Sequence, residues 1–126
     1  MNTRIADPIR EVRRLLSRCA EQFVSFDAEI VRVLGLRSIA DYSSIIDCFY
    51  TFEDTELAND HVRSNGLSAA DGQNDFGLVY LKFYGLMNAC YLQQQAVIVC
   101  TERLWLATDL ARVNASPLIQ YRNDFA

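Results

Sequence analysis

The stretch from Phe76 to Leu106 constrains the fold more than any other part of the sequence. Apolar residues lie on almost every side of it at helical spacing, and Lys82 is the only charge between Asp75 and Glu102. A helix that has no polar face must be covered on all sides. We therefore expect a helix that is either the central helix of the domain or covered by a partner chain.

Small and polar residues inside this helix predict how neighbouring helices meet it. Gly77 and Gly85 each cost about 1 kcal/mol of helix stability relative to Ala, so we expect close helix packing to compensate. Gln93, Gln94 and Gln95 fan over most of a helical turn, so only one or two of them can face one neighbour. We expect them to form hydrogen bonds between helices.

The N-terminal part of the chain has the pattern of a long amphipathic helix. Asp7-Pro8 is typical of an N-cap followed by Pro in the first turn, and Gly35 is typical of a C-terminal stop. Between them, apolar residues repeat at steps of three and four: Ile9, Val12, Leu16, Cys19, Phe23, Phe26, Ile30 and Val33. This spacing predicts one helix over 8–34, about 40 Å long, which suits an antiparallel bundle or a dimer.

The remaining helix starts are indicated by local capping patterns. Ser38 followed by Asp41 resembles a capping box and opens an apolar series that can continue to Asn65. Residues 65–75 have the clearest loop composition, and Asp75 can cap the helix that follows. Ser116-Pro117 predicts the start of a last helix, which we expect to be truncated at the end of the sequence.

These signals predict an all-α fold, an up-and-down bundle of four or five helices in which the first and third are longest. With 126 residues and 51% hydrophobic content, the chain suits a single domain over 1–126. The N-terminal residues have no pattern of a secretion signal, and Asn88 and the glutamines argue against a membrane span. The cysteines lack C-x-x-C spacing, so we expect a cytoplasmic protein with reduced cysteines in its core: Cys19, Cys48, Cys90 and Cys100.

Charge is distributed unevenly along the chain. The net charge is −4, with two more basic than acidic residues in 1–37 and an acidic remainder. Such a chain gains little affinity for nucleic acid from counterion release, so any contact with a polyanion should be local. Four acids form a cluster that we expect to be a solvated helix face: Glu53, Asp54, Glu56 and Asp60.

The signatures of several enzyme classes are missing from the sequence. It has no G-x-G-x-x-G or G-x-x-x-x-G-K loop, no H-E-x-x-H motif and no G-x-S-x-G motif. His61 is the single histidine, so it cannot supply the paired His and carboxylate ligands of a helical-bundle metal site. We expect no metal and no cofactor, and we expect His61 to be an exposed residue near a loop.

The C-terminal segment SPLIQYRNDFA carries a pattern that points to a function. It resembles the start of the last helix in the HEPN superfamily of helical bundles, where an Arg and a His are separated by four to six residues and a polar residue often follows the Arg. Arg122 matches that Arg and Asn123 matches the polar residue. The His is expected directly after Ala126. The order of the helices, with an aromatic and Gln-rich third helix, supports the resemblance.

This resemblance implies a metal-independent endoribonuclease of a toxin or defence type. In that chemistry the 2′-OH of RNA attacks the adjacent phosphate, Arg122 stabilises the developing charge, and Asn123 orients the phosphate or the imidazole. It also implies a homodimer, RNA or a nucleotide as ligand, and an antitoxin or companion protein as partner. Because the acid–base His is not among the 126 residues, we expect this chain to be inactive by itself.

The alternative is a non-catalytic helical module that dimerises or binds a nucleotide or a partner protein. In that case Arg122 is an exposed Arg with Tyr121 packed beneath it. Many HEPN domains lack nuclease activity, so the fold alone does not decide between the two functions.

Overall fold

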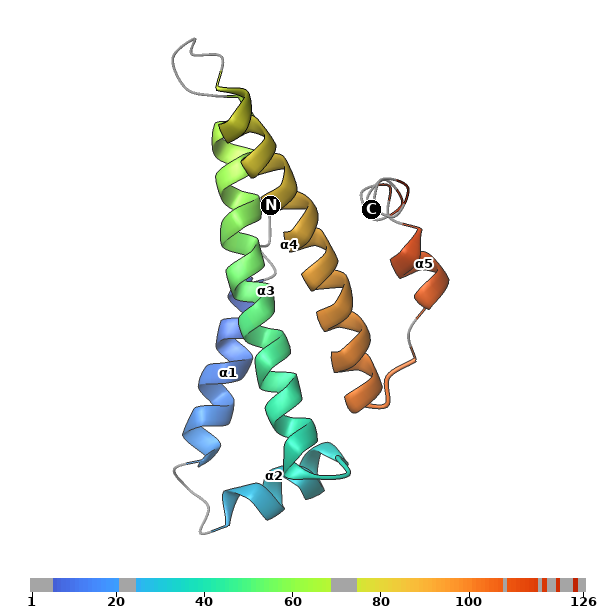
Figure 1. Ribbon diagram of the computed structural model, residues 1–126. Helices are drawn as coiled ribbons and strands as arrows, with labels where there is room; N and C mark the ends of the chain where they lie inside the picture. Colours follow the sequence, from blue (N-terminus) through green and yellow to red (C-terminus); the bar gives the residue numbers. More distant parts are fainter. Residues whose placement is uncertain are drawn as a thin grey trace.

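The computed structural model describes residues 6–20, 25–68, 75–107 and 109–115, together with positions 117, 120 and 124. Within these residues the chain forms α-helices and no strand, which confirms the predicted all-α class (Figure 1). The five helices are α1 (Ala6–Ala20), α2 (Phe26–Leu34), α3 (Ile39–Asn65), α4 (Phe76–Arg103) and α5 (Leu110–Asn114).

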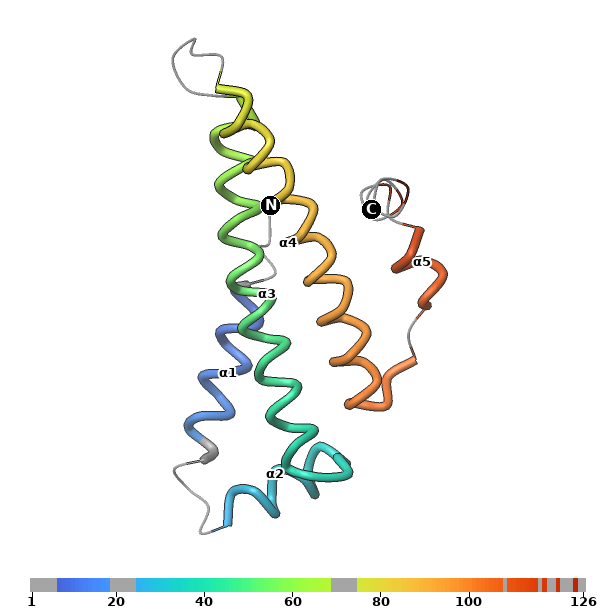
Figure 2. The backbone as a smooth tube through the Cα atoms, viewed as in Figure 1, coloured from blue at the N-terminus to red at the C-terminus, as the bar shows by residue number. Residues whose placement is uncertain are grey.

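The centre of the molecule is the antiparallel pair formed by α3 and α4. These two helices have 27 and 28 residues and lie side by side along most of their length (Figure 2). The buried core between them contains Cys48 and Phe52 from α3 and Ala96 from α4. Partly buried residues pack around this core: Ile9, Phe49, Val97, Val99 and Cys100.

Three predicted helix ends are confirmed. Gly35 ends α2 in the left-handed conformation, with φ 64° and ψ 31°. Asp75 caps α4, because its carboxylate accepts a hydrogen bond of 3.1 Å from the Leu78 N–H. Ser38 is the N-cap of α3, although its hydroxyl makes no capping bond. The carboxylate of Asp41, one turn into α3, instead accepts from the Arg37 N–H at 3.1 Å.

The single long helix predicted over 8–34 is wrong. The chain forms two helices there, and Ser25 precedes α2 with the non-helical angles φ −136° and ψ 74°. In Figure 1, α1 runs alongside α3 whereas α2 lies across the end of the bundle. The aromatic ring of Phe26 contacts that of Tyr42 edge to face at 5.5 Å. The longest helices are therefore α3 and α4, because the N-terminal apolar residues are divided between α1 and α2, which run in different directions.

The C-terminal part contains a short helix that periodicity did not predict. α5 is capped by Asp109, whose carboxylate accepts from the Arg112 N–H at 3.0 Å. Gln94 of α4 donates to the Asn114 side chain at 2.5 Å, so a hydrogen bond joins α4 to α5. Further on, positions 117, 120 and 124 are helical, and the rest of the last helix predicted from Ser116-Pro117 lies outside the described residues.

Candidate functional site

The two residues that carry the HEPN resemblance, Arg122 and Asn123, lie outside the described residues. Gln120 and Asp124, on either side of them, are helical and exposed. The Arg122-Asn123 site therefore stays a prediction.

One surface feature is an exposed side of α4. We define the α4 face as Phe76, Tyr80, Leu81, Tyr84, Gly85, Asn88 and Leu92, which are all exposed. Leu81 is 70% exposed and Tyr84 is 65% exposed. In Figure 1 α3 runs along one side of α4, and α5 stands on the other side. Within one chain α4 is thus not buried all round, because α3 covers only one side of its N-terminal half, and cover by a partner chain stays a prediction.

The two glycines of α4 do not mark close packing inside the chain. A Cβ added at Gly85 would meet nothing within 4 Å, and a Cβ added at Gly77 would lie 3.3 Å from the Asp75 cap carboxylate. The prediction of close helix packing at Gly85 is therefore wrong within the described chain. What remains is an exposed Gly between Leu81 and Leu92, in a face without charges.

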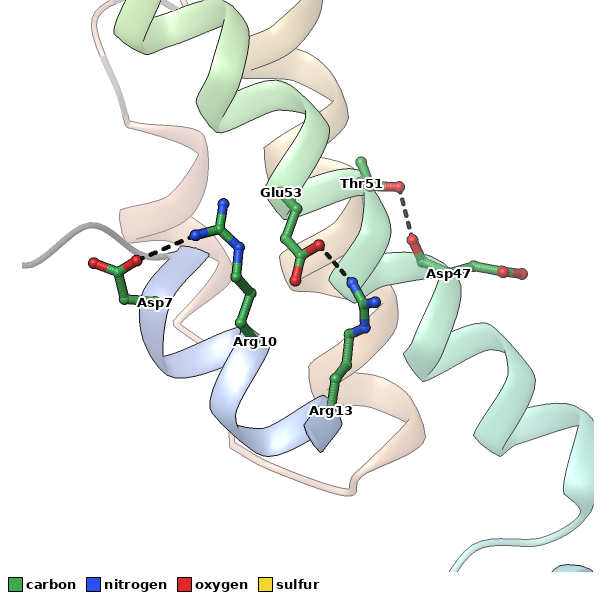
Figure 3. Close-up of polar contacts among 6 residues, drawn as sticks. All are labelled: Asp7, Arg10, Arg13, Asp47, Thr51 and Glu53. Carbon is green, nitrogen blue, oxygen red and sulfur yellow. Dashed lines mark hydrogen bonds and ion pairs between the residues drawn. The ribbon is translucent and has the colours of Figure 1, made fainter. Parts of the chain in front are cut away.

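The acidic cluster on α3 is only partly a solvated face, which corrects the sequence-based interpretation. Glu56 is buried, and the Glu53 side chain is only 16% exposed. Glu53 accepts a hydrogen bond of 2.5 Å from Arg13, which ties α1 to α3 (Figure 3). The Arg13 guanidinium also lies 4.1 Å from the centroid of the Tyr50 ring. Glu53 thus belongs to the contact between α1 and α3, whereas Asp54 is exposed.

The polar residues singled out by the sequence have mainly structural surroundings. Gln94 is buried and bonded to Asn114, so the predicted bond between helices is confirmed for one member of the triplet. His61 is exposed near the end of α3, and its ring nitrogen lies 3.3 Å from the Asn65 side-chain amide. Among the described residues, no group of three or more His, Cys, Asp or Glu side chains could hold a metal ion.

The thiols have the properties expected of core cysteines. Cys48, Cys90 and Cys100 are free. Burial, followed by the nearby Cys100 and Asp47, raises the pKa of the Cys48 thiol to about 11. Burial also raises the pKa of Cys90 and Cys100. A thiol is nucleophilic only as the thiolate, so these groups are inert near neutral pH. The side chain of Cys19 lies outside the described residues.

A pocket that the sequence does not predict lies where the end of α4 meets the start of α3. It brings together Arg37 and Asp41 with Arg103 and Trp105. The sequence pattern indicates only a capping role for Asp41 and no role for the single Trp. The only local signal for the pocket was Trp105 itself, which stands just after the end of α4, where helices commonly have Gly.

No protein-family model, curated protein or solved structure matches this chain. Among the helices that the structure describes, none combines the length and apolar character needed to cross a membrane.

Proposed function

We propose that this chain is a dimerising helical bundle of HEPN type in which the α4 faces of two copies pack together. The observation that carries the proposal is the α4 face itself, a row of exposed aromatic and aliphatic residues on a long helix. Exposed apolar patches of this kind mark interaction sites, and Tyr is enriched at them. The face contains no charged residue that would select a partner of opposite charge, which favours contact between identical surfaces.

A matched pair of substitutions tests the interface. Leu81→Arg puts a charge into the α4 face and should shift the protein from dimer to monomer in analytical ultracentrifugation at micromolar concentration. Leu57→Arg is the control, because Leu57 is 63% exposed on α3, outside the α4 face. A wild-type monomer, or a dimer that is disrupted by Leu57→Arg and not by Leu81→Arg, contradicts the proposal.

RNA cleavage is the second function that we propose, on the basis of Arg122-Asn123. The pair lies outside the described residues, and Gln120 and Asp124 on either side of it are helical. In the proposed reaction the 2′-OH attacks the neighbouring phosphorus, a His accepts its proton, and Arg122 stabilises the charge on the phosphate oxygens. Arg suits this role because its guanidinium stays charged and can donate two hydrogen bonds to a phosphate. Dimerisation would place two such segments in one molecule, and a cytoplasmic location would give them access to RNA.

A one-residue extension tests this second proposal. A chain extended by His after Ala126 should cleave single-stranded RNA in the presence of EDTA, whereas a chain extended by Ala should be about 10²- to 10⁴-fold slower. Arg122→Ala in the His-extended chain should remove most of the activity and leave the circular dichroism spectrum unchanged. The cleavage proposal fails if the His-extended chain folds and dimerises but cleaves no faster than the Ala-extended chain.

A further inference from the structure

A pocket of about 520 Å³ lies where the last turn of α4 meets the turn that precedes α3. Its volume is within the range of small-molecule sites, about 300–1,000 Å³. The residues that give it chemical character are Arg37, Asp41, Glu102, Arg103, Trp105 and Leu106. They combine two guanidinium groups, two carboxylates and one indole.

Trp105 occupies its place at a cost to the backbone. Its φ is 56°, and no other described residue except glycine has a positive φ. The left-handed conformation costs a non-glycine residue roughly 1–2 kcal/mol, and helices commonly have Gly at this position. This conformation closes α4 as Gly35 closes α2, because the Trp105 N–H donates to the Glu102 carbonyl at 3.2 Å and the Leu106 N–H donates to the Thr101 carbonyl at 2.9 Å. A Trp at this position leaves its indole 59% exposed beside the pocket.

The Arg37 guanidinium lies over the indole ring. Its guanidinium carbon lies 4.0 Å from the centroid of the Trp105 ring. A stacked guanidinium keeps its in-plane N–H groups available for an anion, particularly a phosphate. Aromatic rings and guanidinium planes are also the surfaces on which nucleic acid bases stack. The exposed part of Trp105 thus lies beside a group that can bind the charged part of the same ligand.

The pocket is held in shape by a buried carboxylate. Asp41 is buried; one of its oxygens forms an ion pair with the Arg103 guanidinium, and the other accepts a hydrogen bond from the Arg37 backbone N–H, each at 3.1 Å. These bonds connect the end of α4 to the start of α3. Because Arg103 neutralises Asp41, the free charges are those of Arg37 and Glu102. A carboxylate at the edge of a nucleotide site can accept hydrogen bonds from ribose hydroxyls.

We propose that this pocket binds a nucleoside phosphate, either as a free nucleotide or as the end of an RNA strand. The base stacks on Trp105, the phosphate accepts hydrogen bonds from Arg37, and a ribose hydroxyl donates to Glu102. The proposal does not depend on RNA cleavage, because none of these residues belongs to the Arg122-Asn123 pair. Either proposal can therefore fail without the other.

The fluorescence of Trp105 provides a direct assay, because it is the only tryptophan in the sequence. Titration with nucleoside 5′-monophosphates should quench it saturably, with a Kd below about 1 mM. Arg37→Lys keeps the charge but loses the planar guanidinium, so it should weaken binding about tenfold. Arg63→Lys is the control, because Arg63 is an exposed residue of α3 that does not line the pocket, and should leave affinity unchanged.

One comparison identifies the source of the ligand, and three outcomes overturn the proposal. Binding of monophosphates identifies a free nucleotide, whereas binding only of short RNA with a 5′-phosphate, and not with a 5′-hydroxyl, identifies an RNA end. Equal affinity for a nucleoside and its monophosphate overturns the proposal. Unchanged affinity in Arg37→Lys, or no saturable quenching by either probe up to about 10 mM, tenfold above the expected upper limit of the Kd, also overturns it.

Discussion

At the scale of single residues, Trp105 and Cys48 are placed in opposite ways. Trp105 has an unfavourable backbone conformation and a largely exposed side chain, and its visible partner is the Arg37 guanidinium. Cys48 lies in the core between α3 and α4, where burial makes its thiolate unfavourable. The first arrangement has a cost in stability and offers a binding surface, while the second contributes to stability and suppresses reactivity.

Trp105→Gly should change the free energy of unfolding by less than about 1 kcal/mol. Gly relieves the left-handed strain of roughly 1–2 kcal/mol, and the loss of the cation–π contact removes about 0.5–1 kcal/mol. Urea unfolding followed by circular dichroism measures this difference. Calorimetric titration of the same variant should detect no nucleotide binding. A loss of stability above about 2 kcal/mol would mean that Trp105 mainly supports the fold.

Cys48 should react with iodoacetamide very slowly at pH 8 and faster as the pH approaches 11, because its pKa is raised to about 11. The raised pKa favours the neutral thiol in the folded state. Its contribution to stability is therefore complete below pH 9 and is lost as the pH rises from 9 to 11. In Cys48→Ala the free energy of unfolding should fall less steeply over this interval, and an unchanged slope would contradict the assignment.

At the scale of helices, the sequence was most informative where the signal is local. The stop at Gly35 and the cap at Asp75 depend on residues within one turn of the helix end, and both are as predicted. The break between α1 and α2 was missed because Phe23 and Phe26 keep the three-and-four spacing on both sides of Ser25. Periodicity cannot distinguish one straight helix from two helices in register, since contacts such as Phe26 with Tyr42 decide the direction.

The contact between α1 and α3 predicts unequal effects of substitutions at Arg10 and Arg13. Figure 3 shows the ion pairs of both residues. Arg13→Gln leaves the poorly exposed Glu53 without its cationic partner and should cost about 1–3 kcal/mol in urea unfolding. Arg10→Gln removes an ion pair with Asp7 in which both side chains are more than half exposed, so it should cost about 0.5 kcal/mol or less. Equal losses would show that the Arg13 contact does not hold α1 in place.

At the scale of the whole molecule, the sequence predicted that α4 needs covering but not how much of it this chain covers. An apolar helix surface has the same composition whether α3 or a second subunit packs on it. The nucleotide pocket was not predictable either, because Arg37 and Asp41 meet Arg103 and Trp105 only through the antiparallel packing of α3 and α4. The Arg122-Asn123 site still depends on sequence resemblance alone.

Gly85→Leu should have opposite effects on the monomer and on the dimer. In the monomer it replaces an exposed helical Gly with a better helix former where nothing lies within 4 Å, so stability should rise by about 1 kcal/mol. In the dimer the larger side chain should separate the α4 faces and raise the dissociation constant. Unfolding at nanomolar concentration and ultracentrifugation at micromolar concentration measure the two effects. A dimer as tight as the wild type would exclude close packing at Gly85.

The antiparallel arrangement of α3 and α4 also sets the order in which the chain can fold. These helices are separated only by 66–75, so contacts next to this segment require the smallest loss of chain entropy, and later contacts extend from them. We expect truncation of Val62 or Val79, near this end, to slow refolding. Substitutions at Arg103, at the opposite end, should mainly accelerate unfolding. Stopped-flow circular dichroism distinguishes the two, and the pocket around Trp105 should then be among the last parts of the pair to form.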